Sequence, residues 1–270
     1  MTNKGIYTAV SGAIAQSQKL DTIANNIANV NTTAFKKDTQ VFQEYLTAYE
    51  KQGDVIEVPK VPASIESFYD MQGGDRAYVD NAGTFVNFQQ GDIRQTGNAL
   101  DIGIEGRGFF EVLTASGVRL TRNGNFVLDS QGRLATKEGH LVLSSDANAP
   151  LEDRVIQFGP GGKIAVSANG EIRQQNELIS TLSLVDVNDL QALKKMGSSL
   201  FALKENMNPQ IIPAQNIKLH PGHLEASNVN AIEEMTDMIK TTRLFESTQK
   251  AIQAYDSMNR ILANDVGKIE

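Results

Sequence analysis

Few residues of this sequence could do chemistry, and the pair His220 and His223 stands first among them. Two imidazoles could bind one metal ion if further ligands completed the site. Pro221 and Gly222 between them predict a turn, and neither a third histidine nor a pattern of carboxylates accompanies the pair. We therefore expect no metal site here, and the isolated His140 suggests none either.

Two carboxylates, Asp101 and Glu105, share one face of a predicted strand. Such a pair could act as general acid and base, for example in cleaving a glycan. No Ser-His-Asp arrangement shows a local signature, and the chain contains no cysteine, which excludes disulfides, thiolate metal sites and cysteine nucleophiles. An enzyme is therefore the weakest of the interpretations considered.

Two glycine-rich stretches resemble phosphate-binding loops only superficially. In GPGGK, residues 159–163, Ile164 stands where a serine or threonine would follow the lysine. In GIEGRG, residues 103–108, the glycines have the wrong order for a dinucleotide fingerprint and no helix follows. We interpret them as a β-turn and a closely packed strand exit, and we expect no cofactor and no small-molecule substrate.

The charge of the chain argues against nucleic acid as a partner. The formal net charge is −7 and lysines and arginines do not cluster, whereas binding a duplex requires clustered cations. No run approaches about 18 consecutive apolar residues, so no membrane span is expected. A cleaved signal peptide is not expected either, because the helical pattern continues through the cleavage-like sequence Ala13-Ile14-Ala15.

Both ends of the chain carry long helical patterns with heptad-like spacing, typical of helices that pack lengthwise on other helices. The N-terminal series is Ile6, Ala9, Ala13, Leu20, Ile23, Ile27 and Val30. The C-terminal series is Ile232, Met235, Ile239, Phe245, Ile252, Tyr255, Leu262 and Val266. The patterns predict helices of roughly 28 and 35 residues, or about 42 and 52 Å. Such lengths indicate a coiled coil or a packed array of helices.

Between the two helices the period of the sequence changes to two, as expected for half-buried strands. Short alternating segments are separated by Ser116-Gly117, Asn123-Gly124, Gln131-Gly132 and Glu138-Gly139, and another pair flanks Asn169-Gly170. Asn-Gly between such segments is a strong hairpin signal. We therefore predict that the middle of the chain is mostly antiparallel β-structure.

These patterns predict an α+β fold in which long N- and C-terminal helices pair as a coiled coil and enclose an inserted, mostly antiparallel β domain. The predicted boundaries are residues 1–35 with 225–270 for the helical domain, 36–84 for an extended connector, and 85–224 for the β domain. Apolar surface left over on the paired helices would then require other subunits to cover it.

The N-terminal helix also contains Asn25, Asn26, Asn29 and Asn31, although asparagine is a mediocre helix former. One interpretation is a frayed helix end. The other is that these amides face other helices in a crowded array, where a buried asparagine penalises every wrong register. On the second interpretation, the four asparagines and the apolar positions of both helices, Val266 excepted, form an assembly interface.

Three blocks of the sequence resemble signatures of the flagellar rod and hook family. IYTAVSGAIAQSQKLDTIANNIANVNTTAFKK is similar to its N-terminal signature, and HPGHLEASNVNAIEEMTDMIKTTRLFESTQKAIQAYDSMNRIL to its C-terminal one. GNALDIGIEGRGFFEV, followed by LTRNGNFVLDSQGRLAT, is similar to the central β region of the family. The chain length and the C-terminal residues MTDMI…RLFE…K are most similar to those of a proximal-rod member, and a distal-rod member is the close alternative.

The resemblance implies a structural protein without catalysis or cofactor. It implies export through the flagellar type III apparatus without a cleaved signal peptide, and helical polymerisation with copies of itself and other rod proteins. The location would be the periplasmic rod of the basal body, with the terminal helices around the channel and the β domain outside. From the residues alone, a monomeric binding module on a helical stalk stays open as an alternative.

Overall fold

The computed structural model describes residues 4–47, 76–146, 149–204, 207, 209–215 and 217–266. The chain divides into two compact units, each described by itself. Residues 1–25, 39–85 and 232–270 make up the helical unit, and residues 26–38 and 86–231 make up the β unit.

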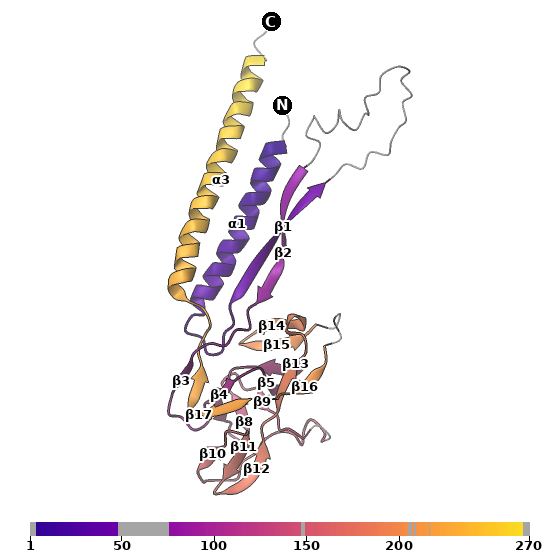
Figure 1. The fold of residues 1–270 in the computed structure, drawn as a ribbon, viewed down its shortest axis with the longest axis vertical. Helices are drawn as coiled ribbons and strands as arrows, with labels where there is room; N and C mark the ends of the chain where they lie inside the picture. The colour runs from indigo at the N-terminus through magenta and orange to yellow at the C-terminus, as the bar shows by residue number, and fades with distance from the viewer. Residues whose placement is uncertain are drawn as a thin grey trace, which may run out of the picture. The chain divides into compact units, whose positions relative to one another are not determined.

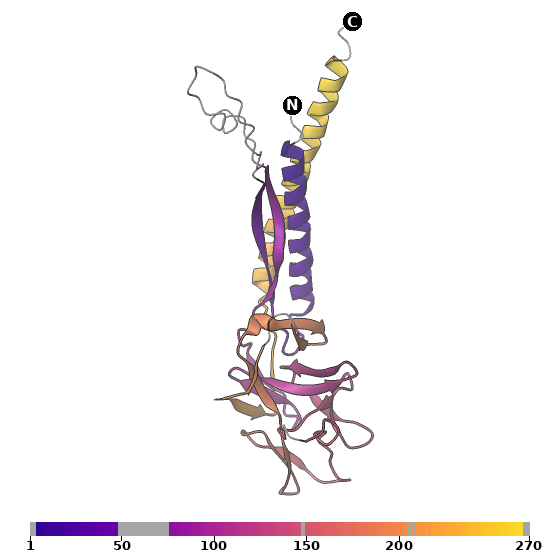
Figure 2. The same ribbon diagram turned by 90° about the vertical axis from the view of Figure 1, so that its right-hand side faces the viewer.

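Within the described residues, the helical unit is built from two helices and a long two-stranded sheet. Helix α1 spans Lys4–Ala28 and helix α3 spans Ala231–Val266, close to the lengths that the apolar spacing predicts. The two helices lie side by side and run in opposite directions (Figures 1 and 2), and the ring of Tyr255 lies against Gly5. No helix of the described residues is long and apolar enough to cross a membrane.

Strands β1 (Asp38–Thr47) and β2 (Arg76–Val86) pair with each other in the stretch where the sequence predicted only an extended connector. The prediction missed them because apolar residues such as Val41, Val79 and Phe85 are exposed here, so apolar side chains do not mark the buried side of these strands. Thr22 on α1 donates a hydrogen bond to Gln40 on β1 over 3.5 Å. Residues 48–75, the centre of the predicted connector, lie outside the described residues.

The β unit consists of short strands in several sheets, and every strand pair with an assigned register is antiparallel, as predicted. The largest sheet has the order β14-β15-β6-β5-β9-β8-β7, with β13 joining β5 to β16; β10-β11-β12, β17-β4 and β18-β3 form smaller sheets. The bounds are β3 Ile93–Gln95, β4 Ile102–Glu105, β5 Phe109–Thr114, β6 Gly117–Thr121, β7 Phe126–Leu128, β8 Leu134–Thr136, β9 Leu141–Val142, β10 Ile164–Val166, β11 Glu171–Gln174, β12 Glu177–Thr181, β13 Leu184–Val187, η1 Leu190–Ala192, β14 Leu193–Gly197, β15 Leu200–Leu203, β16 Ile211–Pro213, β17 Lys218–Pro221 and β18 His223–Glu225.

Four of the five predicted turns connect paired strands, and the turn at Asn123-Gly124 does not. It links β6 to β7, which pair with other strands. Gly124 instead lets two backbones approach each other, because a Cβ atom at this position would lie 1.8 Å from the carbonyl oxygen of Ile102. The hairpin prediction was wrong here, since a glycine needed for close packing carries the same sequence signal as a turn glycine.

Two apolar clusters form the core of the β unit. The larger is centred on Phe110 and Phe126, whose rings meet edge to face 5.1 Å apart. The smaller is centred on Phe109 and Phe201, with Phe88 packed against both. Both clusters draw their residues from the stretch 86–219, so residues 26–38 and 225–231 contribute to neither.

Candidate assembly interface

Helix α3 exposes apolar side chains and buries polar ones. Ile232, Met235 and Ile239 are 78%, 51% and 56% exposed, although all three are large and apolar. Their spacing of three and four residues places them on one face of the helix. Glu234 and Thr241, by contrast, are only 2% exposed. The helix therefore presents to solvent a face that would normally be covered.

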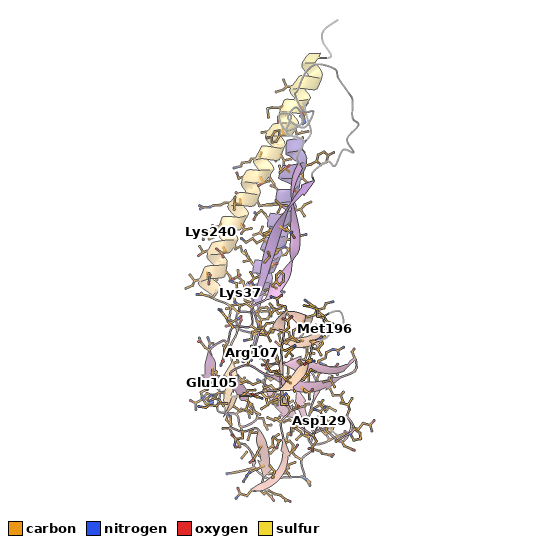
Figure 3. All side chains as sticks on the ribbon, turned by 45° about the vertical axis from the view of Figure 1, so that its right-hand side comes forward. Lys37, Glu105, Arg107, Asp129, Met196 and Lys240 are labelled. Carbon is orange, nitrogen blue, oxygen red and sulfur yellow. The ribbon has the colours of Figure 1, made fainter. Side chains whose placement is uncertain are left out.

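The remaining predicted positions of α3 behave differently from these three. Phe245 and Ile252 are half-buried, and Tyr255 packs on Gly5 while remaining largely exposed. The side chain of Leu262 lies outside what the structure describes. Figure 3 shows Lys240 on the side of α3 that faces away from α1, next to Ile239 in the sequence.

The positions of α1 that were predicted for the assembly interface are mostly half-buried. Ile23 and Asn26 are buried, whereas Asn25 and Asn31 are exposed. The half-buried positions are Ile6, Ala9, Ala13, Leu20, Ile27, Asn29 and Val30.

The prediction missed a second set of residues on α1. Tyr7, Val10 and Ile14 are exposed apolar residues. They repeat the spacing of the exposed set on α3 and lie on a different face of α1 from Ile23. The sequence contained the signal, since these residues also recur at three and four positions, but the heptad series through Ile6 obscured it.

Asn26 uses both hydrogen-bonding groups of its amide within the chain. Its Nδ2 donates to the carbonyl oxygen of Asp38 and its Oδ1 accepts from the Asp38 N–H, each over 2.9 Å. The amide thus joins the end of α1 to the first residue of β1, as a backbone partner in a sheet would. The role of Asn25, Asn29 and Asn31 in assembly stays a prediction.

Three segments that are distant in the sequence meet in a buried charge cluster that no sequence pattern predicted. Glu225 accepts from Lys36 Nζ over 2.7 Å and from Arg122 Nε over 2.8 Å, and all three side chains are nearly or completely buried. Burial lowers the pKa of the Lys36 ammonium, since desolvation outweighs the attraction of Glu225. Lys36 and Glu225 are 189 positions apart, so no local pattern could reveal the pairing.

The residues considered for chemistry are held in structural contacts. His220 Nε2 lies 2.6 Å from a carboxylate oxygen of Glu105, and its ring packs edge to face on that of His223. The carboxylate of Asp101 is buried and accepts from the Asn98 side chain over 3.2 Å. Glu105, labelled in Figure 3, therefore pairs across β4 and β17 with His220. Within the described residues, no three His, Asp or Glu side chains gather as a metal site would require.

Comparison with known proteins matches three separate parts of the chain to flagellar family models. Residues 6–36 match "Flagella basal body rod protein", residues 103–174 match "Flagellar hook protein FlgE/F/G D1 domain", and residues 220–265 match "Flagellar basal body rod FlgEFG protein C-terminal". Lys36, Arg122 and Glu225 each fall in a different one of these parts, so the buried cluster joins all three.

Curated relatives align with almost the whole chain. The flagellar basal-body rod protein FlgF of Caulobacter vibrioides is 30% identical over 99% of this chain and 99% of its own length. The rod proteins FlgG of Bacillus subtilis and of Borreliella burgdorferi are 32% and 33% identical, each over 97% of this chain and 98% of the relative. The chain therefore belongs to the flagellar basal-body rod protein family.

Proposed function

We propose that this chain is a structural subunit of the bacterial flagellar basal-body rod and that it assembles through its terminal helices. The observation that carries the proposal is the exposed apolar face of α3 at Ile232, Met235 and Ile239. Its relatives carry the names FlgF and FlgG, both described as basal-body rod proteins. The subunit would thus form part of the axial drive shaft.

Neighbouring subunits are the partners that would cover this face. Burying what remains exposed of these three side chains contributes about 3–6 kcal/mol before the costs of association and ordering. Tyr7, Val10 and Ile14 on α1 offer a second, unlike face. Contact between unlike faces of successive copies is head-to-tail and, where the rotation between copies does not close a ring, leads to an open helical array. The predicted interface, including Asn25, Asn29 and Asn31, and a coiled-coil packing of the helices belong to this proposal.

The proposal also includes the position and route of the subunit. We place it in the proximal rod, as a FlgF-type protein, with the FlgG-type distal rod as the alternative. The terminal helices α1 and α3 would line the channel, and the β unit would lie outside it. Export through the flagellar type III apparatus without a cleaved signal completes this picture, in which the protein needs neither cofactor nor substrate.

A substitution on α3 tests the proposal in cells that lack their own copy of the gene. Ile232→Ser, Met235→Ser and Ile239→Ser are combined in one chain, and Glu233→Ser with Lys240→Ser, exposed on a different side of α3, serves as a control. We expect the triple variant to keep its circular dichroism but to be missing from purified basal bodies, with loss of motility. The control should swim. Complete rods and normal motility with the triple variant would refute assembly through this face.

A further inference from the structure

The first and last segments of the β unit, residues 26–38 and 225–231, lie outside both apolar clusters, although Ala34 and Val229 within them are buried. Ala34 N–H donates to the carbonyl oxygen of Glu225 over 2.8 Å, and Ala226 N–H donates to that of Asp92 over 2.8 Å. These two segments could therefore separate from the β core without opening either apolar cluster.

Glu225 is the centre of these contacts. Besides its ion pairs to Lys36 and Arg122, its Oε1 accepts from the backbone N–H of Gly91 over 2.9 Å. Lys36 Nζ has one further acceptor, the carbonyl oxygen of Gln89 at 2.7 Å, while Arg122 also donates to three backbone carbonyls. Loss of the Glu225 charge would leave two buried cations without a counter-charge, a costly state in a protein interior.

A second set of polar contacts joins the same segments. Asn228 Oδ1 accepts from Lys37 N–H over 2.7 Å, and Asn228 Nδ2 donates to the carbonyl oxygens of Asn87 and Gln89. The N-terminal segment also contacts β14, because Lys195 Nζ lies 2.8 Å from the Asp38 carboxylate and 4.0 Å from the centre of the Phe35 ring. The N-terminal and C-terminal segments are thus hydrogen-bonded to each other, and both are hydrogen-bonded to residues 87–91.

We propose that the Lys36–Glu225–Arg122 cluster is a latch that attaches both terminal segments, residues 33–38 and 225–229, to the β core in a single event. Glu225 closes the latch because it neutralises a cation from the N-terminal segment and one from the core at the same time. When its charge is lost, both segments detach together while the two apolar clusters stay folded. The latch concerns the β unit alone and does not depend on rod assembly.

Amide hydrogen exchange of the full-length chain tests the latch, with Glu225→Gln as the main variant. We expect exchange in residues 33–38 and 225–229 to accelerate together by about tenfold or more, because their opening no longer breaks ion pairs. Exchange in β5 and β6 should stay near the wild-type rate. Glu171→Gln, which removes an exposed ion pair with Arg173, is the matched control and should change neither region.

The double variant Lys36→Met with Glu225→Gln separates a charge latch from a loss of general stability. It restores the net charge of the cluster, so the terminal segments should exchange more slowly than in Glu225→Gln. Three results would overturn the latch. Exchange in the terminal segments could be unchanged in Glu225→Gln, or exchange in β5 and β6 could accelerate as much as in these segments. The double variant could also exchange in these segments as fast as Glu225→Gln. Should Glu225→Gln fail to fold, the latch requires the double variant to fold, and an unfolded double variant overturns it.

Discussion

Single side chains of this protein replace backbone partners where regular structure ends. The side-chain amide of Asn26, near the end of α1, forms two hydrogen bonds with the backbone of Asp38, the first residue of β1. Asp129 does the same in the turn between β7 and β8, where its carboxylate accepts from the backbone N–H groups of Gln131 and Arg133, both over 2.8 Å. Both contacts are local, so their effects can be isolated by substitution.

Removing the Asn26 amide should destabilise the chain measurably. Asn26→Ala breaks two hydrogen bonds and leaves the N–H and C=O of Asp38 without these partners, which should cost about 1–3 kcal/mol of the free energy of unfolding. Urea denaturation measures the loss, with Asn31→Ala at an exposed position as the control. A cost for Asn26→Ala no larger than that of the control would contradict the assigned role.

The Asp129 turn predicts a dependence of stability on pH. Hydrogen bonds from Arg133 and Gln131 hold the pKa of the Asp129 carboxyl below its ordinary value. Because the folded chain binds this proton less readily than the unfolded chain, the stabilisation is present above about pH 4 and is lost as the pH falls through the folded pKa. Asp129→Asn should therefore reduce the acid sensitivity of urea stability, whereas Glu138→Gln at an exposed turn position should not. Equal pH profiles for wild type and Asp129→Asn would show that the turn makes no such contribution.

At the scale of elements, the turn between β11 and β12 has a backbone that suits Asn176 but that Gln175 disfavours. Gln175 and Asn176 both have positive φ angles, 51° and 75°, as a two-residue hairpin with a primed turn requires. Asn-Gly suits this backbone better than Gln-Asn. Gln175→Asn with Asn176→Gly should therefore stabilise the chain by about 0.5–1 kcal/mol, measured by thermal unfolding. The same pair of substitutions would lower the melting temperature if the turn were of another type.

The elements could be predicted from sequence wherever a periodic burial pattern governs them. Both helices follow from apolar residues at steps of three and four, and Ser116-Gly117 and Asn169-Gly170 do lie between paired strands. The pattern failed for β1 and β2, whose sheet carries exposed apolar side chains. It also failed at Asn123-Gly124, where the glycine serves close packing.

At the scale of the whole molecule, contacts between distant residues determine what the sequence could not show. A single sequence shows which residues are charged, but it does not show that Glu225 meets Lys36 and Arg122 in the interior. For the same reason, the spacing of apolar residues on α3 indicated a packing helix but did not separate the face that stays exposed, at Ile232 and Ile239, from the half-buried face at Phe245 and Ile252. That distinction needed the structure, and it is the basis of the proposed assembly.

Cryo-electron microscopy of basal bodies purified from cells that carry this chain tests the central claim most directly. We predict that the chain is present in the rod and that Ile232, Met235 and Ile239 of each copy are covered by helices of neighbouring subunits. A rod in which these three side chains face solvent, or a rod that lacks the chain altogether, would contradict assembly through the terminal helices.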